Sequence, residues 1–183
     1  MRVISGIYKG RILKTVKDLS VRPATDRVKQ TLFDMLVNRI PLEGATVLDL
    51  FAGSGSLGIE ALSRGAARAT FVENDSNAAE HIEKNLEALG CGGNAELIES
   101  DALSFVSRCN ESFDLIFADP PYKFEEIEQI PAMIFKARIL KPNGYVLVEH
   151  TKDLKFESTE LYAAGPEKKF GRTLVTFFRY QSE

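Results

Sequence analysis

The chain has few of the residues that serve redox, metal-binding or membrane roles. It contains no tryptophan, two histidines and two cysteines among 183 residues. Cys91 and Cys109 lie in unrelated contexts without the spacing of metal ligands, so we interpret both as reduced, small apolar side chains. No apolar run approaches the roughly 18 residues that a membrane span needs, and the first residues lack the pattern of a signal peptide. We therefore expect a cytoplasmic protein with no metal ion and no membrane partner.

The two histidines do not indicate a catalytic base. His81 falls on the polar face of an expected helix, and His150 comes just after an expected strand. Neither has a metal-binding partner at a suitable spacing, so we interpret each as a surface or packing residue.

Charge is distributed unevenly along the chain. The net charge is −3, yet residues 1–30 hold eight basic and two acidic side chains, a local balance of +6, and the remainder carries −9. A basic N-terminal part followed by an acidic remainder predicts a surface that faces a polyanion. A solvated hairpin with charged edges explains the pattern equally well. If the first interpretation holds, Arg2, Lys9 and Arg11 are the side chains that we expect to bind phosphates.

The order of the expected elements predicts the fold class. Two β-like runs around a turn at 8–10 predict an opening hairpin, and a helix is expected from Thr25, its N-cap, to about Ile40, before Pro41. After Gly44, strands and helices alternate. The β-like runs of the hairpin are 3–7 and 11–16, and the later strands are expected at 46–51, 69–73, 95–99, 113–118, 144–149, 156–162 and 173–180. The later helices are expected from the glycine-rich turn through 64, at 77–89, from 101 and at about 126–140.

This alternation predicts an α/β protein with a Rossmann-like, doubly wound sheet of seven mainly parallel strands. The last two strands have no long helix between them, which indicates an antiparallel strand at the edge. A chain of 183 residues with 44% hydrophobic content is typical of one domain that buries about 70% of its unfolded surface. Within that single domain, 1–183, we expect residues 25–183 to form the core and residues 1–24 to form a basic hairpin extension.

A glycine-rich turn follows the first strand of the expected sheet. Residues 47–58 read VLDLFAGSGSLG, with Gly53, Ser54 and Gly55 in the turn. Ligands of open α/β sheets bind beyond the carboxyl ends of the strands, and glycines let the backbone approach them closely. Glu73, which ends the second strand, can accept hydrogen bonds from both hydroxyls of a ribose. These features fit a nicotinamide dinucleotide and S-adenosylmethionine equally well.

Asp49 distinguishes between these two cofactors. It lies inside the first strand, where a carboxylate repels a pyrophosphate but attracts the ammonium and sulfonium groups of S-adenosylmethionine. The alternative role, capping of the following loop, is less favoured because ionised groups inside apolar strands are rare unless they are paired. Asp101 and Ala102, after the third strand, are placed to meet the adenine, although Asp101 is equally suited to be a helix N-cap. The pattern predicts S-adenosylmethionine as the cofactor.

Residues 119–122 follow the fourth strand and read Asp-Pro-Pro-Tyr. A residue before proline is held in an extended conformation, so Asp119 should point outward, and the carbonyl of Pro120 should be free to accept a hydrogen bond. These two acceptors can hold both hydrogens of an aromatic amino group and aim its lone pair at a methyl donor. Tyr122 offers a ring on which an extruded base can stack. We predict that Asp119, Pro120 and Tyr122 form the catalytic site of a methyltransferase.

With these motifs the chain resembles the Rossmann-like methyltransferases that act on amino groups, and more narrowly the RsmD family of bacterial 16S rRNA guanine-N2 methyltransferases. The narrower resemblance rests on five segments, which are residues 4–11, 22–28, 49–55, 119–122 and 168–173. In the last of these, Phe170 stands where the family often has tyrosine. The resemblance implies methyl transfer to a guanine of 16S rRNA within a partly assembled small ribosomal subunit. It also implies that Arg22 and Thr25 lie near the cofactor.

Other functions stay open on the sequence. An adenine-N6 DNA methyltransferase uses the same Asp-Pro-Pro-Tyr logic, but usually with a target-recognition domain for which 183 residues leave no room. A protein-glutamine methyltransferase would normally have asparagine in place of Asp119. A non-catalytic RNA-binding assembly factor could keep the fold, but it would not require Asp119, Pro120 and Tyr122 together.

Overall fold

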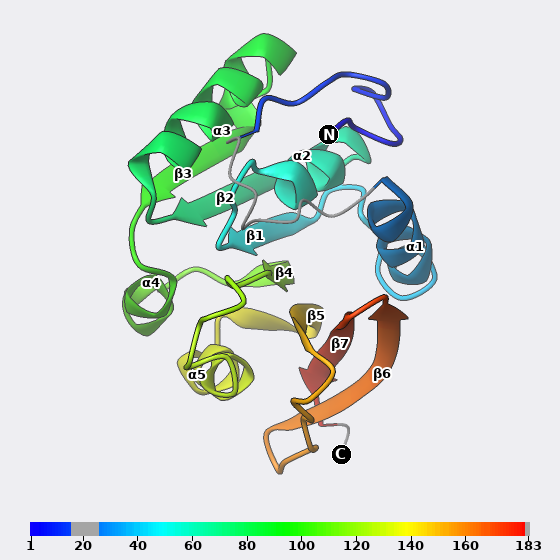
Figure 1. The fold of residues 1–183 in the computed structure, drawn as a ribbon, viewed down its shortest axis with the longest axis vertical. Helices are drawn as coiled ribbons and strands as arrows, with labels where there is room; N and C mark the ends of the chain where they lie inside the picture. Colours follow the sequence, from blue (N-terminus) through cyan, green and yellow to red (C-terminus); the bar gives the residue numbers. More distant parts are fainter. Residues whose placement is uncertain (16–25, 182–183) are drawn as a thin grey trace.

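The structure is a computed structural model, and it describes residues 1–15 and 26–181. These residues form a seven-stranded sheet of order β3-β2-β1-β4-β5-β7-β6 with helices on both faces (Figure 1). The strands are β1 (Thr46–Leu50), β2 (Arg68–Glu73), β3 (Ala95–Glu99), β4 (Phe113–Ala118), β5 (Leu140–Thr151), β6 (Tyr162–Phe170) and β7 (Thr173–Tyr180). The helices are α1 (Asp26–Val37), α2 (Ser56–Ser63), α3 (Ser76–Leu89), α4 (Ala102–Arg108), α5 (Gln129–Ala137) and the 3-10 helix η1 (Gly92–Asn94).

The predicted Rossmann-like sheet is confirmed. Strands β1 to β5 pair in parallel, since a crossover returns the chain to the same end of the sheet between successive strands. The strand order reverses between β1 and β4, which is where ligands of open α/β sheets bind. Strand β7 runs antiparallel between β5 and β6, so the antiparallel strand lies inside the sheet and β6 forms the edge.

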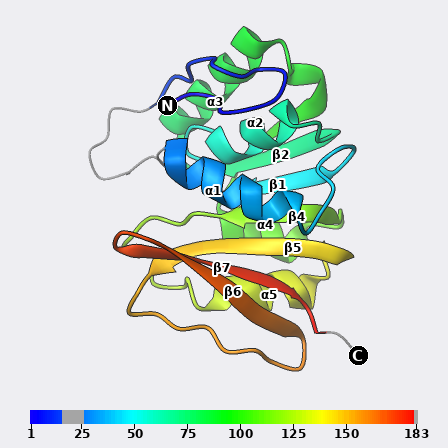
Figure 2. The same ribbon diagram turned by 90° about the vertical axis from the view of Figure 1, so that its right-hand side faces the viewer.

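Two hydrophobic cores, one on each face, hold the sheet between its helices. Helices α1, α2 and α3 cover one face and α4 and α5 the other (Figures 1 and 2). Phe33 of α1 packs against Phe117 of β4 with ring centroids 5.7 Å apart, and Phe135 of α5 packs against Tyr162 of β6 at 5.0 Å. Because both faces are covered, the central strands are almost uniformly buried, as their unbroken apolar sequences predict.

The prediction of an opening β-hairpin is wrong in part for the N-terminal segment, residues 1–15. The chain does reverse, but the described residues form only one isolated antiparallel bridge, between Arg2 and Ile12. Val3 still bonds across the reversal to Gly10 and Arg11, but the N–H groups of residues 4, 5, 7 and 8 bond to Glu60 and Ser63 of α2 and so leave the hairpin ladder. Gly6 has a φ of 82°, and a Cβ there would lie 1.7 Å from the carbonyl oxygen of Ser63, so only glycine permits this approach.

The helices and strands depart from the prediction at several bounds. Helix α1 ends at Val37, before Ile40, and its expected N-cap Thr25 lies outside the described residues. Helix α5 is shorter than expected, and Pro131 lies in its first turn, where no backbone N–H is needed. Strand β5 is longer than expected at both ends.

The strand predicted at 156–162 is wrong. Those residues form a loop, in which Phe156 packs edge-on against the rings of His150 and Phe178, and β6 begins only at Tyr162. The polar residues of β6 and Pro166 concealed the strand, but an edge strand tolerates both, here with a register shift between Ala164 and Glu167.

Candidate active site

The glycine-rich turn joins β1 to α2 at the edge of the sheet where β1, β2, β4 and β5 end, which we call the carboxyl edge. Phe51, Gly53 and Gly55 have φ values of 57°, 56° and 73°, so the backbone folds tightly before α2 begins. Among the described residues, a Cβ on Gly53 would have only the carbonyl oxygen of Phe51 near it, at 4.0 Å. None of these residues therefore blocks the approach of a ligand to this backbone. Gly58, by contrast, packs on Phe71, whose ring a Cβ would meet at 2.4 Å.

Asp49 lies under this turn with 2% of its surface exposed. Its Oδ2 accepts a hydrogen bond from the backbone N–H of Gly58 at 2.9 Å, within the first turn of α2. This is the capping role that the sequence offered as the alternative, and it engages one of the two carboxylate oxygens. Burial raises the pKa of Asp49 to about 7, against the effect of the Gly58 hydrogen bond, and Glu73 adds repulsion. A cation bound beside Asp49 would stabilise its ionised form.

Glu73 ends β2, as predicted, and is nearly buried. Its Oε2 accepts the N–H of Gly53 at 2.7 Å, and its Oε1 accepts those of Asn74 and Asp75, both at 2.9 Å. The carboxylate thus fixes the glycine-rich turn to the end of β2. Since a carboxylate has about four acceptor positions, three such bonds leave capacity for a ribose hydroxyl.

Asp101 and Ala102 begin α4 after β3. Asp101 is the N-cap of α4, and its Oδ1 accepts the N–H of Ser104 at 2.8 Å, while Ala102 is buried. The helix-capping interpretation of Asp101 therefore holds. The contact of its second carboxylate oxygen with adenine stays a prediction. Arg22 and Thr25, the other two expected cofactor residues, lie outside the described residues.

Asp119, Pro120 and Tyr122 follow β4 at the carboxyl edge. Pro120 is buried and Tyr122 is 56% exposed, so its ring is available for stacking. Burial raises the pKa of Asp119 well above its usual value, and the charges of Glu149 and Asp49 raise it further. A bound cation would stabilise the ionised forms of these carboxyl groups, whereas a pyrophosphate would disfavour them, so this part of the edge favours a cationic ligand.

The sequence analysis missed two features of this site. Glu149 lies on β5 one residue beyond the pair formed by Ala118 and Val148, so it is next to Asp119 across the sheet. The rule that placed Asp119 at the site, the carboxyl end of a parallel strand, would also have found it. Phe51 was missed as well. Its ring packs edge-on against Phe124 with centroids 5.0 Å apart, which connects the glycine-rich turn to the loop after β4.

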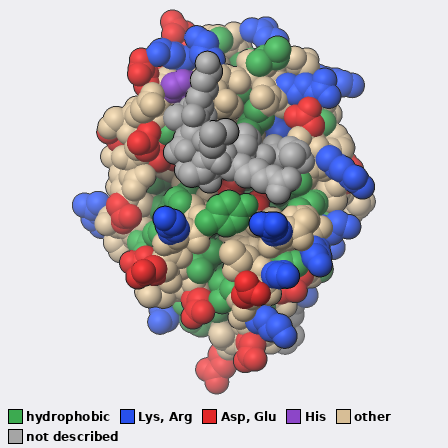
Figure 3. Space-filling view, in the orientation of Figure 1, with side chains coloured by type: hydrophobic (Ala, Val, Ile, Leu, Met, Phe, Trp, Pro, Cys, Tyr) green, Lys and Arg blue, Asp and Glu red, His purple; other side chains and the backbone are tan. Residues whose placement is uncertain are grey.

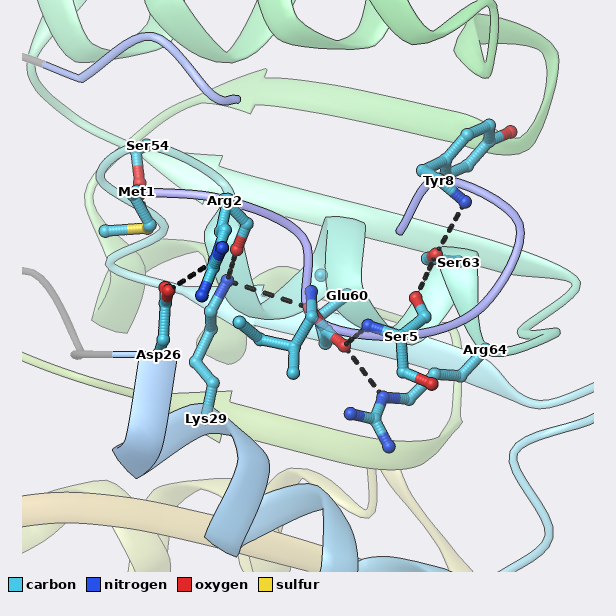
Figure 4. Close-up of polar contacts among 12 residues, drawn as sticks. Met1, Arg2, Ser5, Tyr8, Asp26, Lys29, Ser54, Glu60, Ser63 and Arg64 are labelled. Carbon is cyan, nitrogen blue, oxygen red and sulfur yellow. Dashed lines mark hydrogen bonds and ion pairs between the residues drawn. The ribbon is translucent and has the colours of Figure 1, made fainter. Parts of the chain in front are cut away.

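A buried carboxylate anchors the N-terminal segment beside this site (Figure 4). Glu60 of α2 is fully buried, and it accepts the N–H groups of Ile4 at 2.8 Å and Ser5 at 3.0 Å and the Nε–H of Arg64 at 2.8 Å. These bonds replace those that a regular hairpin would have made.

A buried lysine completes the anchor. Lys29 of α1 is fully buried, lies 3.7 Å from Glu60 and donates to the carbonyl of Arg2 at 2.6 Å. Burial lowers the pKa of Lys29, although the charge of Glu60 counters this. The N-terminal segment is thereby joined to both α1 and α2.

A second buried contact joins the N-terminal segment to the glycine-rich turn. Asn85 of α3 accepts the N–H of Lys14 at 2.7 Å and donates to the carbonyls of Lys14 at 2.9 Å and Ser54 at 3.1 Å. The Ser54 hydroxyl also contacts the sulfur of Met1 at 3.5 Å (Figure 4). Ser54 of the glycine-rich turn thus contacts the N-terminal segment twice, at Met1 directly and at Lys14 through Asn85.

The three predicted RNA-binding residues have different environments. Arg2 pairs with Asp26 at 2.6 Å, and Arg11 donates to the carbonyl of Ala88 at the end of α3, at 2.8 Å. Lys9 is exposed. Two of these three side chains therefore already serve the packing of the N-terminal segment, and their binding to RNA stays a prediction.

The remaining titratable candidates lie apart from the site. His81 bonds to Asn77 within α3, and His150 is buried between Thr151 and Thr176. Cys91 and Cys109 are free thiols whose pKa values are raised by burial. In the described part of the chain no group of acidic, histidine and cysteine residues suits a metal ion, and no helix is long and apolar enough to cross a membrane.

The sheet topology and the carboxyl edge define a Rossmann-like methyltransferase. A structure of a putative methyltransferase, yhhF, from Escherichia coli matches with a TM-score of 0.87 and 32% identity, covering 100% of this chain and 99% of that one. The family described as "Conserved hypothetical protein 95" matches residues 1–179.

Two curated proteins are similar to the chain over most of their length. "Ribosomal RNA small subunit methyltransferase D" of Haemophilus influenzae is 39% identical over 185 residues, with 100% of this chain and 94% of that protein covered. "Putative rRNA methyltransferase YlbH" of Bacillus subtilis is 40% identical over 162 residues, with 87% of each covered. The chain belongs to the family of ribosomal RNA small subunit methyltransferase D, the RsmD family.

Proposed function

We propose that the protein transfers a methyl group from S-adenosylmethionine to the exocyclic N2 amino group of a guanine in 16S rRNA, within a partly assembled small ribosomal subunit in the cytoplasm. The observation that carries the proposal is that Asp119 and Pro120 lie at the same edge of the sheet as Asp49 and Gly53. A methyl acceptor and a methyl donor bound there would meet between β1 and β4.

The residues present fit S-adenosylmethionine. No described residue fills the space above Gly53, whose φ is positive, so a ligand can reach its backbone there. The buried carboxylate of Asp49 would attract the ammonium group of the ligand, and Glu73 would accept from a ribose hydroxyl. When bound, the cofactor supplies a methyl group on a positively charged sulfur. A pyrophosphate would instead be repelled by Asp49 and Asp119.

Asp119 and Pro120 would act on the amino group of the base. The Asp119 carboxylate and the Pro120 carbonyl would each accept one N–H, which favours a pyramidal nitrogen and orients its lone pair. A nitrogen that had accepted the methyl group would carry a positive charge and would have to lose a proton. The raised pKa of Asp119 makes its carboxylate a suitable acceptor for that proton.

Tyr122 would hold the base in place. The ring is exposed beside Asp119, where an extruded guanine can stack on it. Replacing Tyr122 with alanine should therefore raise the KM for RNA, because stacking on a base is worth about 1–3 kcal/mol. Replacing it with phenylalanine, which keeps the ring, should preserve the KM.

Nucleoside analysis tests the proposal directly. Unmodified 16S rRNA, free and in partly assembled particles, would be incubated with the enzyme and labelled S-adenosylmethionine, digested and analysed by mass spectrometry. We expect N2-methylguanosine, with more product from particles than from free RNA. Methylated adenosine would contradict the guanine assignment, and an absence of label in any RNA would contradict the activity.

The N-terminal residues need a separate test. Replacing Arg2, Lys9 and Arg11 with alanine should weaken RNA binding and leave the affinity for S-adenosylmethionine unchanged if these side chains bind phosphates. Because Arg2 and Arg11 also make internal contacts, Lys9→Ala alone distinguishes a loss of phosphate binding from a loosened N-terminal segment.

A further inference from the structure

The β6–β7 hairpin ends at the carboxyl edge of the sheet. Thr151, the last residue of β5, pairs with Thr173, the first residue of β7. The turn between β6 and β7 therefore lies beside the end of β5, one strand further from β4. Figure 2 shows this turn on the same side of the molecule as the N-terminus and the start of α1. The turn is two strand spacings, about 10 Å, from β4 across the sheet. It also lies three residues further along the strand direction, because Ala118 ends β4 opposite Val148, whereas Thr173 pairs with Thr151.

The turn is tight and fixed by the sheet. Phe170 pairs with Thr173, so only Gly171 and Arg172 connect the strands. Gly171 has a φ of 62° whereas Arg172 does not have a positive φ, which is the pattern of a II′ turn with glycine in its first central position. The Thr173 hydroxyl donates to the carbonyl of Phe170 at 3.2 Å, and the Phe170 ring packs on the core. Side chains at this turn are therefore held on a rigid support.

Three basic side chains project from this turn. Lys168, Lys169 and Arg172 are exposed, and the structure records no ion pair for any of them with a described residue. The adjacent acid, Glu167, accepts from the Thr176 hydroxyl at 3.3 Å. Lysine and arginine side chains gather on this face around the place where Figure 1 shows the end of β6 (Figure 3).

Protection of a sheet edge is an alternative reason for lysines on β6, since charges on an edge strand prevent pairing with other chains. The distribution of charge along β6 does not fit that reason. The half of the strand away from the turn, residues 162–166, carries no charge, and its Pro166 and register shift already interrupt the edge. The cations occur only in the half that reaches the carboxyl edge.

We propose that the hairpin tip, residues 168–172, binds phosphates of the RNA strand that flanks the methylated base. This proposal rests on the proposed function and adds a second RNA-binding surface to it, separate from the N-terminal segment. Lys168 and Lys169 extend from opposite faces of β6, because successive side chains of a strand alternate. The tip can therefore contact the backbone of a strand that passes over the turn, a few nucleotides from a base held at Asp119. Such contacts add affinity and orientation without reading sequence.

The charge distribution predicts how salt affects these contacts. Each phosphate contact contributes about 0.7–0.9 to the slope of log affinity against log salt. Removing three contacts should therefore lower the magnitude of the slope by about 2–3. The ratio of wild-type to variant affinity should shrink by about fourfold to sixfold for each doubling of the salt concentration.

The test replaces Lys168, Lys169 and Arg172 with glutamine and measures methylation and RNA binding over a salt series. The KM for RNA should rise, and the salt slope should fall as calculated. The kcat at saturating RNA and the affinity for S-adenosylhomocysteine should not change, because the tip lies outside the reacting groups. Single variants at each position should divide the effect among the three side chains.

A matched control removes the same charge elsewhere. Lys84→Gln, Lys136→Gln and Arg138→Gln together take three positive charges from α3 and the end of α5, and should leave the RNA affinity and its salt slope unchanged. An equal effect in both triple variants would overturn the proposal, since it would reflect net charge alone. An unchanged KM for RNA and an unchanged salt slope in the hairpin variant would also overturn the proposal. If that variant also aggregated, the cations would be assigned to protection of the sheet edge. If the wild-type enzyme methylates no RNA, the proposed function fails instead, and RNA binding by the two variants still tests the surface.

Discussion

Glu73 holds the backbone of Gly53: the Oε2 atom accepts the Gly53 N–H at 2.7 Å. The acid at the end of β2 and the glycine-rich turn after β1 are therefore one unit before any ligand binds. A residue that the sequence assigned to the ribose also determines the shape of the turn that receives the cofactor.

Glu73→Ala should weaken the binding of S-adenosylhomocysteine by about 1–3 kcal/mol, because charged hydrogen bonds are lost. It should also lower the free energy of unfolding, since three backbone N–H groups lose their acceptor. Calorimetry and urea unfolding measure the two effects. Glu99→Ala, at the matching position of β3, is the control and should change neither by more than about 0.5 kcal/mol. Equal affinities in the two variants would show that Glu73 plays no part in binding.

Asp49→Asn should make the stability of the protein less dependent on pH. The folded pKa of Asp49 is about 7 and the ordinary value is 3.8, so the folded state retains a proton that the unfolded chain releases. Wild-type stability should therefore decrease as the pH rises from about 4 to about 7. The variant, which keeps an acceptor for Gly58, should be more stable by a few kcal/mol above pH 7 and about equally stable near pH 4.

The same variant should bind S-adenosylmethionine more weakly, since the attraction to the ammonium group is lost. In the wild type, the affinity should fall by up to about tenfold per unit as the pH drops below 7, because Asp49 must lose its proton to bind a cation. Unfolding in urea at several pH values and titration calorimetry measure both effects. Identical pH dependence in variant and wild type would rule out Asp49 as the titrating group.

Asp119→Ala should lower kcat by at least about 10²-fold and leave cofactor affinity nearly unchanged, as expected for the loss of a contact made to the reacting group. Asp114 lies at the other end of β4, where it pairs with Lys141 at 2.7 Å. Asp114→Ala should lower stability without lowering kcat, and so serves as the control. Single-turnover methylation measures the chemical step. A normal rate for Asp119→Ala would mean that Asp119 only shapes its loop.

Glu149→Gln should shift the pH dependence of kcat. Burial raises the pKa of Asp119 most, and the charge of Glu149 raises it further, so removing that charge should lower the pKa of Asp119. If Asp119 acts as a carboxylate, kcat decreases below its pKa, and this decrease should move to lower pH in the variant. Glu149→Asp keeps the charge and should keep the wild-type profile. Coincident profiles for all three proteins would separate Glu149 from the chemistry.

Glu60→Gln should destabilise the protein by about 3–5 kcal/mol, because Lys29 is left as a buried charge without its partner. The double variant Lys29→Met and Glu60→Gln should recover part of this loss, since it removes the unpaired lysine, while Arg64 still lacks its carboxylate partner. Chemical denaturation of the two single variants and the double variant gives the interaction free energy of the pair. Additive losses would show that the two side chains do not interact.

Sequence patterns predicted the parts of the fold that depend on local periodicity. The bounds of β3 and β4 agree with the prediction residue for residue, because short apolar runs between turn residues determine them. The carboxyl-edge positions of Asp49, Glu73 and Asp119 followed from the ends of such strands. The division into residues 1–24 and 25–183 stays a prediction.

Contacts between distant residues could not be predicted in this way. The N-terminal segment has the local pattern of a hairpin, yet it bonds to Glu60, which is 55 residues or more away along the chain. Asn85 lies on the apolar face of α3 beside Ile82 and Leu86, and the sequence analysis did not single it out, although this position is typical of a buried polar residue that needs partners. Which partners it has depends on how α3 packs on the rest of the fold.

The position of β7 between β5 and β6 constrains the order in which the sheet is assembled during synthesis. Strand β6 leaves the ribosome before β7, but in the described structure it pairs only with β7. Until β7 has been made and has joined β5, β6 and its lysines have no place in the sheet, and the edge of β5 stays unpaired. The enzyme therefore completes its carboxyl edge only with the last strand of the fold, so a nascent chain that lacks β7 lacks this part of the surface.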